Sequence, residues 1–502
     1  MKIARAYVLL LPAGILACLW AVAPKSWGVP TGPAGPVVAS SASGALPQAK
    51  ITAHGIAGCS AQACHGAPEP VDSANDVSKS AYAFTRWINH DKHAEAFRSL
   101  FNDRSVRMAK NLGIKTAHED ARCLACHTIP ATVYSGQWGE VAFDARSVNL
   151  RRDGIGCESC HGIAEESWLR PHTTTAFKNS TARKGEYDKY GMTWLNDLAT
   201  RAQTCAGCHV GAPADPTNNI PLRDVDHDLI AAGHPRLNFE FSTYLANMPP
   251  HWVEKDRNKP ESANLRKDLE PLFEAHVWEV GQVETTRASL ELLRYHAGQD
   301  SSGAYPHKQW PEFAEHDCFA CHHDLLSKSW RVEAKDYYKN RKPGAPPISP
   351  WNLSLPLRKL LADAKSLETV REEMSTSLPD RTKVANAAKV AEAALMLNPS
   401  KNAKDLKQQM AKVIPATDEE LNRLTWDDAA QIYYALTELG LAQNAPDAAF
   451  NKHLKELGDN LSFTHSHDSV RDDSPRNFRR PPSDSGEKVR EALKKLRALL
   501  VR

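Results

Sequence analysis

The pattern C-x-x-C-H occurs four times in this chain, and this repetition constrains the fold more than any other feature of the sequence. With 11 cysteines and 21 histidines in 502 residues, one accidental copy is expected in about one such chain in a hundred. Four copies therefore indicate a repeated functional site. They consist of Cys123, Cys126 and His127; Cys157, Cys160 and His161; Cys205, Cys208 and His209; and Cys318, Cys321 and His322.

This spacing suits the covalent attachment of haem. Two thiols about one helical turn apart can each add to a vinyl group on one edge of a porphyrin. The histidine that follows then lies below the iron as its proximal ligand. A zinc half-site also uses C-x-x-C, but zinc does not need a histidine directly after every second cysteine. A disulfide is the other alternative, and the repetition favours haem c over both.

A fifth pair, in CSAQACHG, has four residues between its cysteines instead of two. Its cysteines are Cys59 and Cys64, and His65 follows at once. If the pair formed a disulfide, His65 would be incidental, yet every cysteine pair in the mature region precedes a histidine. A small bulge would bring both thiols to the porphyrin, and the spacer contains the small residues Ser60, Ala61 and Ala63. We therefore expect five covalently attached haem c groups.

The N-terminus has the layout of a secretory signal. Lys2 and Arg5 precede an uncharged, largely apolar run that extends to Ala23. Residues 1–23 are expected to be a signal peptide or an N-terminal membrane anchor, and lipidation at Cys18 also fits. Residues 24–50 follow as a flexible linker rich in Ala, Gly, Pro and Ser. The expected location is the periplasm, and with Cys18 set aside no cysteine is left for a structural disulfide.

The remainder of the chain predicts an all-α fold, because no alternation of period two is sustained anywhere. Residues 51–345 contain all five motifs and are expected to form a pentahaem cytochrome domain. Residues 346–502 lack cysteine and consist of amphipathic helical segments, which indicates a C-terminal helical domain. Helices are expected over 84–101 and 263–298, and a loop over 468–487. The net charge of +2 argues against a nucleic-acid partner.

Residues 55–212 resemble the cytochrome c-554 family, multihaem carriers that accept electrons from hydroxylamine oxidoreductase. The shared segments, in the same order, are WINHDKHAEAF, RCLACH, GIGCESCHG, WLRPHTTTAF and TCAGCH. The resemblance implies a compact helical tetrahaem core with haems stacked in pairs and a role in periplasmic electron transfer. It further implies His93 and His172 as distal ligands on other haems, and an open position at the haem of His127. This chain departs from the family in its longer first spacer, its fifth motif and its long helical tail.

Other histidines are candidates for the sixth coordination position, which decides whether a haem transfers electrons or binds substrate. His234 lies between two motifs and is flanked by Gly233 and Pro235, so we expect it to be a ligand. Further candidates are His54, His90, His118, His227, His251, His276, His296 and His323. Structural or solvent-facing roles are expected for His307, His316, His453, His465 and His467. Haem propionates or ordinary surface charge would account for Arg86, Arg170 and Arg236.

These features predict a periplasmic pentahaem cytochrome that carries single electrons between redox partner proteins through mostly bis-histidine haems. No catalytic side chain is expected in that case. The alternative is an oxidoreductase that acts on a small nitrogen or sulfur compound at an open haem. A third interpretation makes the helical tail a docking scaffold for partner proteins.

Overall fold

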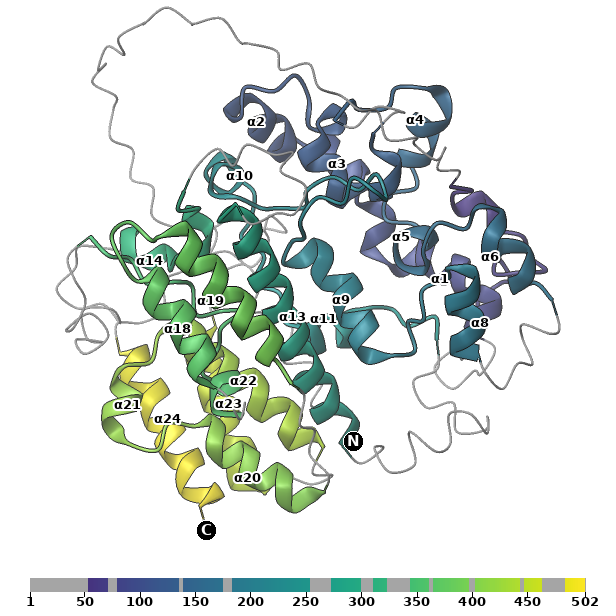
Figure 1. Ribbon diagram of the computed structural model, residues 1–502. Coiled ribbons are helices and arrows are strands. Elements are labelled where there is room, and N and C mark those ends of the chain that lie inside the picture. The colour runs from purple at the N-terminus through teal and green to yellow at the C-terminus, as the bar shows by residue number, and fades with distance from the viewer. Residues whose placement is uncertain are drawn as a thin grey trace, which may run out of the picture.

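The computed structural model describes residues 53–70, 79–134, 139–174, 183–252, 272–298, 310–322, 344–360, 364–396, 402–442, 447–462 and 484–501. These residues fold almost entirely into helices joined by short connections, as Figure 1 shows. Within these ranges, β structure is confined to isolated bridges such as the one between Ala212 and Arg223. The predicted all-α fold is therefore confirmed.

The signal at residues 1–23 and the linker at 24–50 lie outside the described residues. In the part of the chain that is described, no helix has the length and hydropathy needed to cross a membrane.

Short helices carry and surround the cysteine motifs. Several of them begin at an aspartate whose side chain accepts backbone N–H groups of the first turn, as Asp120, Asp197 and Asp226 do. Such caps satisfy donors that the helix itself leaves without partners, so these helix starts are fixed locally. The helices of this half are α1 (Ala83–His90), α2 (Asp103–Asn111), α3 (Ala121–His127), α4 (Ala145–Arg151), α5 (Cys157–His161), α6 (Glu165–His172), α8 (Arg183–Tyr190), α9 (Leu198–His209), α10 (His227–Ala232), α11 (Phe241–Asn247) and α14 (Cys318–Cys321).

Single 3-10 turns connect these helices. One of these turns interrupts a segment that was predicted to be a continuous helix. The helix expected over 84–101 is broken at Asp91, which has extended backbone angles and caps the next turn with its side chain. The 3-10 turns are η2 (Ile56–Gly58), η3 (Lys79–Tyr82), η4 (Lys92–Glu95), η5 (Arg98–Phe101), η6 (Ala117–Glu119), η7 (Pro130–Thr132) and η9 (Phe313–Glu315).

The C-terminal half is a bundle of amphipathic helices around α22. Two capping boxes, Thr417 with Glu420 and Thr425 with Asp428, start α21 and α22. The last helix begins at Ser485, inside the segment 468–487 that was expected to be a loop; residues 468–483 are not described. The helices are α17 (Leu355–Leu360), α18 (Ala364–Met374), α19 (Arg381–Ala394), α20 (Ala403–Val413), α21 (Asp418–Asn422), α22 (Trp426–Leu441), α23 (Ala448–Leu461) and α24 (Ser485–Leu500).

The long helix α13 (Phe273–His296) joins the two halves of the molecule (Figure 1). Val277 and Val280 pack beside α9 and α11, in a small core of the cysteine-rich half. Trp278 packs into the main core of the C-terminal bundle, and Leu290 and Leu293 pack with α18 and α19. Residues on both sides of the predicted boundary at 345 therefore share hydrophobic cores.

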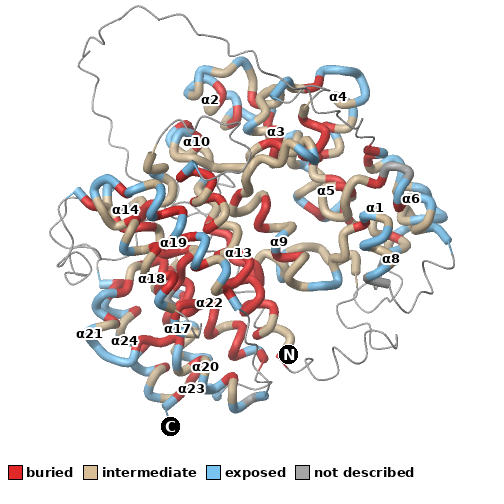
Figure 2. The backbone as a smooth tube through the Cα atoms, in the orientation of Figure 1, coloured by how far each residue is buried: buried red, intermediate tan, exposed pale blue. Residues whose placement is uncertain are grey.

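Burial differs sharply between the halves. In Figure 2 the buried residues concentrate along α13 and in the C-terminal bundle, whereas the motif helices are mostly intermediate or exposed. The cores of the cysteine-rich half are small, for example Ala164, Trp168 and Met192. Because each porphyrin is a large apolar plate, bound haem would complete the interior of this half.

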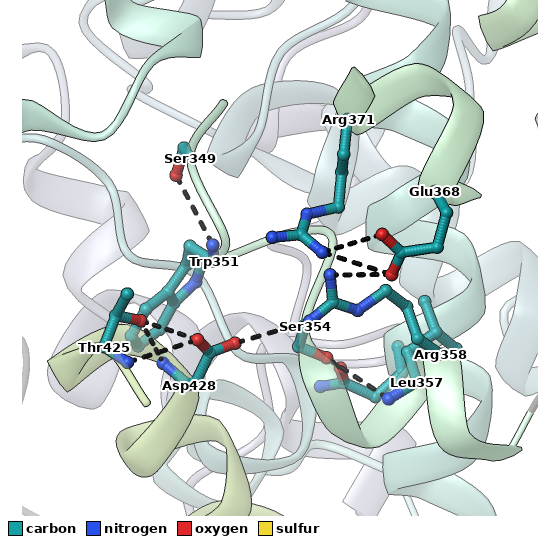
Figure 3. A network of polar contacts seen from close by, with 10 residues as sticks. Ser349, Trp351, Ser354, Leu357, Arg358, Glu368, Arg371, Thr425 and Asp428 are labelled. Atoms are coloured by element: carbon teal, nitrogen blue, oxygen red, sulfur yellow. Dashed lines mark hydrogen bonds and ion pairs between the residues drawn. The ribbon is translucent and has the colours of Figure 1, made fainter. Parts of the chain in front are cut away.

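Polar contacts, several of them buried, join the C-terminal helices to one another and to α13 (Figure 3). Arg358 of α17 lies 3.2 Å from Glu368 of α18 and 3.9 Å from Asp428 of α22. Ser354 donates to Gln282 of α13 at 2.9 Å. Paired charges of this kind are weak evidence for added stability, but each contact ties a different pair of elements together.

Candidate haem sites

Four of the five motifs lie on helices, which places their two cysteines on one face. CLACH ends α3, CESCH forms α5, CAGCH ends α9, and His322 directly follows α14. Residues three apart in an α-helix are neighbours on its surface. The geometry expected for two thiols on one porphyrin edge is therefore built into these helices.

The first motif forms a tight turn instead of a helix. The backbone N–H groups of Cys64 and Gly66 both donate to the carbonyl oxygen of Ala61, at 2.8 and 3.0 Å. A Cβ atom on Gly66 would collide with the carbonyl oxygen of Ser60, so this close approach requires glycine. The two extra residues of the spacer are thus absorbed within a compact loop.

Two carboxylates anchor this loop to the third motif. The buried Glu158 of CESCH accepts the backbone N–H groups of His54 and Gly55 at 3.2 and 2.7 Å. Asp153 accepts the N–H of Ile56 at 2.9 Å. A hydrogen bond to the Cys59 thiol, followed by burial, raises the pKa of Cys157. The first and third motifs therefore touch through their first cysteines.

His65 of the first motif faces His172 at the end of α6. The two Nε2 atoms are 3.4 Å apart, and the rings are near-parallel, with an angle of 19° between their planes. The other ring nitrogen of His65, Nδ1, is hydrogen-bonded to the carbonyl oxygen of Ser80 at 2.5 Å. One metal ion held by both imidazoles, with bonds of about 2 Å each, needs the nitrogens about 4 Å apart. The observed separation is close to that value.

The histidines of the third and fourth motifs also have a second ring nearby, at steeper angles of 62° and 74° between the ring planes. The ring centroids of His161 and His251 are 6.4 Å apart, and those of His209 and His93 are 6.0 Å apart. Burial lowers the pKa of His161 to about 3 and the pKa of His209 to about 4. Buried imidazoles are thereby kept neutral, and neutral imidazole is the form that binds a metal.

The two remaining motifs share α10. His227, its first residue, faces His322 with ring centroids 6.2 Å apart and an angle of 27° between the ring planes. His234, two residues beyond the helix, lines the same cavity as His127. Burial, and then the charge of His127, lower the pKa of His234 to about 4. Each of the five motif histidines therefore has a second histidine nearby.

These pairs can be compared with the predicted ligands. The predicted ligands His93, His172 and His234 each lie near the histidine of a motif. In each case that motif is not the one closest to the ligand along the chain. His227 and His251 were weaker candidates, because nothing local in the sequence sets them apart. The family resemblance implies an open position at His127, and His234 lines the same cavity as His127.

The remaining histidines have other neighbours. His90 lies 3.2 Å from Glu69, and the ring of His118 stacks on Phe101. His307, His323, His465 and His467 lie outside the described residues. Carboxylates neighbour His276, His296 and His453; His316 is buried, and the backbone of His54 is bound by Glu158.

The thiols reveal which motifs adjoin one another. Cys126 of the second motif and Cys208 of the fourth form a hydrogen bond that raises the pKa of Cys126. After burial, the charges of Cys205 and Cys208 contribute to raising the pKa of Cys160 to about 12. Together with the contact of Cys59 and Cys157, this gives the order first, third, fourth, second.

One cavity connects the second, third and fourth motifs. Its volume is about 2590 Å³, and its lining includes Cys126, Cys160, Cys205 and Cys208. Ligand pockets are commonly about 300–1,000 Å³, so this cavity can hold more than one group of porphyrin size. The paired histidines, the paired thiols and this largely apolar space fit haem c.

Arginines lie near some of these sites. Arg223 approaches the Cys208 sulfur at 4.0 Å, and Arg236 approaches the Cys318 sulfur at 3.2 Å. Arg86 forms an ion pair with Glu69. Arg236, which the sequence had singled out together with Arg86 and Arg170, thus contacts a cysteine of a motif.

Comparison with known proteins supports part of this picture. Residues 59–162 match the family described as cytochrome c554 and c-prime. The match spans the first three motifs and the segment with Asp91 and His93, and it ends before His172 and the fourth motif. It confirms the resemblance to a multihaem cytochrome that binds haem c and acts in electron transfer. No curated protein and no solved structure matches the chain.

Proposed function

We propose that this chain, with its cytochrome c554-like segment, is an exported pentahaem cytochrome that carries single electrons between redox partner proteins in the periplasm. One observation carries the proposal: each of the five motif histidines has a second histidine nearby. Covalently bound haem c supplies the one-electron change at each site. The protein holds the sites in place and sets their surroundings.

Axial pairing favours transfer over substrate chemistry. The pairs are His65 with His172, His127 with His234, His161 with His251, His209 with His93, and His322 with His227. A site with two protein ligands has no free coordination position. The competing function, an oxidoreductase for a small nitrogen or sulfur compound, needs at least one such position.

The contacts between motifs support a continuous path. The first motif adjoins the third, the third adjoins the fourth, and the fourth adjoins the second. Helix α10 extends this order to the fifth motif, since His227 begins this helix and His234 lies two residues beyond its end.

The ends of this order are open to partners. Cys64 of the first motif and Cys321 of the fifth are both exposed. Redox partners would therefore dock beside the first and fifth sites. The N-terminal signal and the family resemblance both support a periplasmic location, with membrane attachment depending on how residues 1–23 are processed.

Carbon monoxide binding to the chemically reduced protein tests the proposal. If all five sites have two protein ligands, the visible spectrum does not change when the gas is added. The variant His227→Ala is the positive control, because it opens the fifth site. A spectral change in the unaltered protein would support the enzyme instead.

The intact mass of the exported protein tests the number of haems. The proposal requires a mass increase that corresponds to five haem groups, whereas four would contradict it. The same measurement reports how the N-terminus has been processed.

A further inference from the structure

Asp91 is a buried carboxylate at the junction of α1 and η4. Its side chain is 4% exposed, and Oδ1 lies 2.9 Å from Nδ1 of His93 and accepts the backbone N–H of His93 at 3.0 Å. Oδ2 is buried without a hydrogen-bond partner in the described structure. A buried charge with an unsatisfied oxygen is costly, so its retention calls for a role beyond capping a 3-10 turn.

Asp91 lies close to the third site as well as the fourth. The hydrogen bond to Nδ1 of His93 joins Asp91 to the fourth site, where the ring centroids of His93 and His209 are 6.0 Å apart. Asp91 and Cys160 of the third motif line the same cavity.

The surrounding loop holds this carboxylate in position. Trp87 of α1 donates its indole N–H to the carbonyl oxygen of Ile155 at 3.2 Å, and the N–H of Ile155 donates to His93 at 3.0 Å. A Cβ atom on Gly154 would lie 2.7 Å from the carbonyl oxygen of His93. The segment before CESCH therefore packs directly on the segment that carries Asp91.

Other paired histidines have different surroundings. Neutral backbone carbonyl oxygens neighbour Nδ1 of His65, His127 and His234. In the described residues, Nδ1 of His161 and of His251 is buried without a hydrogen-bond partner. At the third site, neither candidate ligand has a hydrogen-bond acceptor for Nδ1 in the described residues. At the fourth site, Nδ1 of His93 is hydrogen-bonded to a carboxylate.

We propose that Asp91 lowers the reduction potential of the fourth site through His93 and, more weakly, that of the third site through space. This inference rests on the proposed function. A carboxylate on Nδ1 makes the imidazole a more basic ligand, and a negative charge in a low-dielectric interior stabilises the oxidised state. Electrons would then reside mainly at the first, second and fifth sites, and the third and fourth sites would act as a transit region between them.

A spectroelectrochemical titration of the intact holoprotein tests this inference. Asp91→Asn keeps an oxygen that can cap η4 but removes the charge. We expect two of the five components to move to higher potential, one more than the other, while three stay in place. Asp91→Glu keeps the charge. Its reduction potentials should therefore lie closer to those of the unaltered protein than the potentials of Asp91→Asn do.

Asp197→Asn is the matched control. Asp197 caps α9, the helix of the fourth motif, but it is exposed and lies at the far end of that helix from His209. Its titration should be unchanged. If Asp91→Asn left every component in place while the spectra showed five low-spin haems, Asp91 would be only a cap and the inference would fail. A high-spin haem in the unaltered protein would instead count against the proposed function.

Discussion

The decisive residues are histidines whose chemistry depends on burial. Burial lowers the pKa of His161 to about 3 and the pKa values of His209, His234 and His251 to about 4. Each ring is therefore neutral at physiological pH and has a lone pair available for a metal. The same residue type on the surface, such as His90, forms an ordinary contact with a carboxylate.

Removal of one distal histidine should open one site only. His227→Ala removes the ring that faces His322, 6.2 Å away between centroids. We expect one of five ferric haems to change from low spin to high spin in the electron paramagnetic resonance spectrum. His90→Ala should leave the spectrum unchanged, because His90 is exposed and pairs with Glu69. An unchanged spectrum for His227→Ala would refute the assignment of His227.

His296 should make stability depend on pH. Its ring lies between Asp224 and Glu315, at 2.9 and 3.0 Å. Burial lowers its pKa, but these two hydrogen bonds and charges raise it to about 10. In the unfolded chain the pKa is about 6.5, so this stabilisation is complete below about pH 6.5 and is lost as the pH rises towards 10.

We therefore predict that the free energy of unfolding falls between about pH 6.5 and pH 10, by up to a few kcal/mol. Denaturant unfolding at several pH values in this window measures the effect. His296→Gln should flatten the dependence, since glutamine does not titrate. Equal slopes for the two proteins would show that His296 is not responsible.

Among the structural elements, the loop of the first motif depends on a single glycine. Gly66→Ala forces a Cβ atom against the Ser60 carbonyl oxygen and should disrupt the turn that brings Cys59 and Cys64 together. We expect the intact mass to show loss of one haem in a large fraction of the protein. Gly185→Ala is the control, because a Cβ there meets open space on α8. A full complement of haem in Gly66→Ala would contradict this view of the loop.

The helices that carry the motifs could be predicted because they depend on local sequence. The spacing within C-x-x-C-H sets which residues share a helix face, as in α3 and α9. The pairing of His161 with His251 depends on how segments far apart in the sequence pack, and no local pattern encodes it. The break at Asp91 was missed because its cap competes with an otherwise helical pattern.

At the scale of the whole molecule, α13 makes the two halves interdependent. Its buried residues pack with α9 on one side and with α19 and α22 on others. Buried hydrogen bonds reinforce this, such as the one from Gln282 to Gln431 at 3.1 Å. The C-terminal helices therefore complete the core that supports the haem half, whether or not they also dock partner proteins.

Truncation after residue 345 tests this interdependence. The shortened chain would expose Trp278, Leu290 and Leu293, which are buried in cores shared with C-terminal helices. Exposing one large apolar side chain that is normally buried costs about 1.5–3 kcal/mol. The three side chains together would therefore cost an amount that rivals the total stability of many domains. We expect little soluble holoprotein. A well-folded fragment with five haems would show that the halves are independent.

Electron paramagnetic resonance of the fully oxidised protein, with spins counted against total iron, tests the central claim most directly. If five histidine pairs each hold one haem, the spectrum contains five low-spin ferric haems per chain and no high-spin signal. A high-spin haem, or fewer than five irons per chain, would contradict the account.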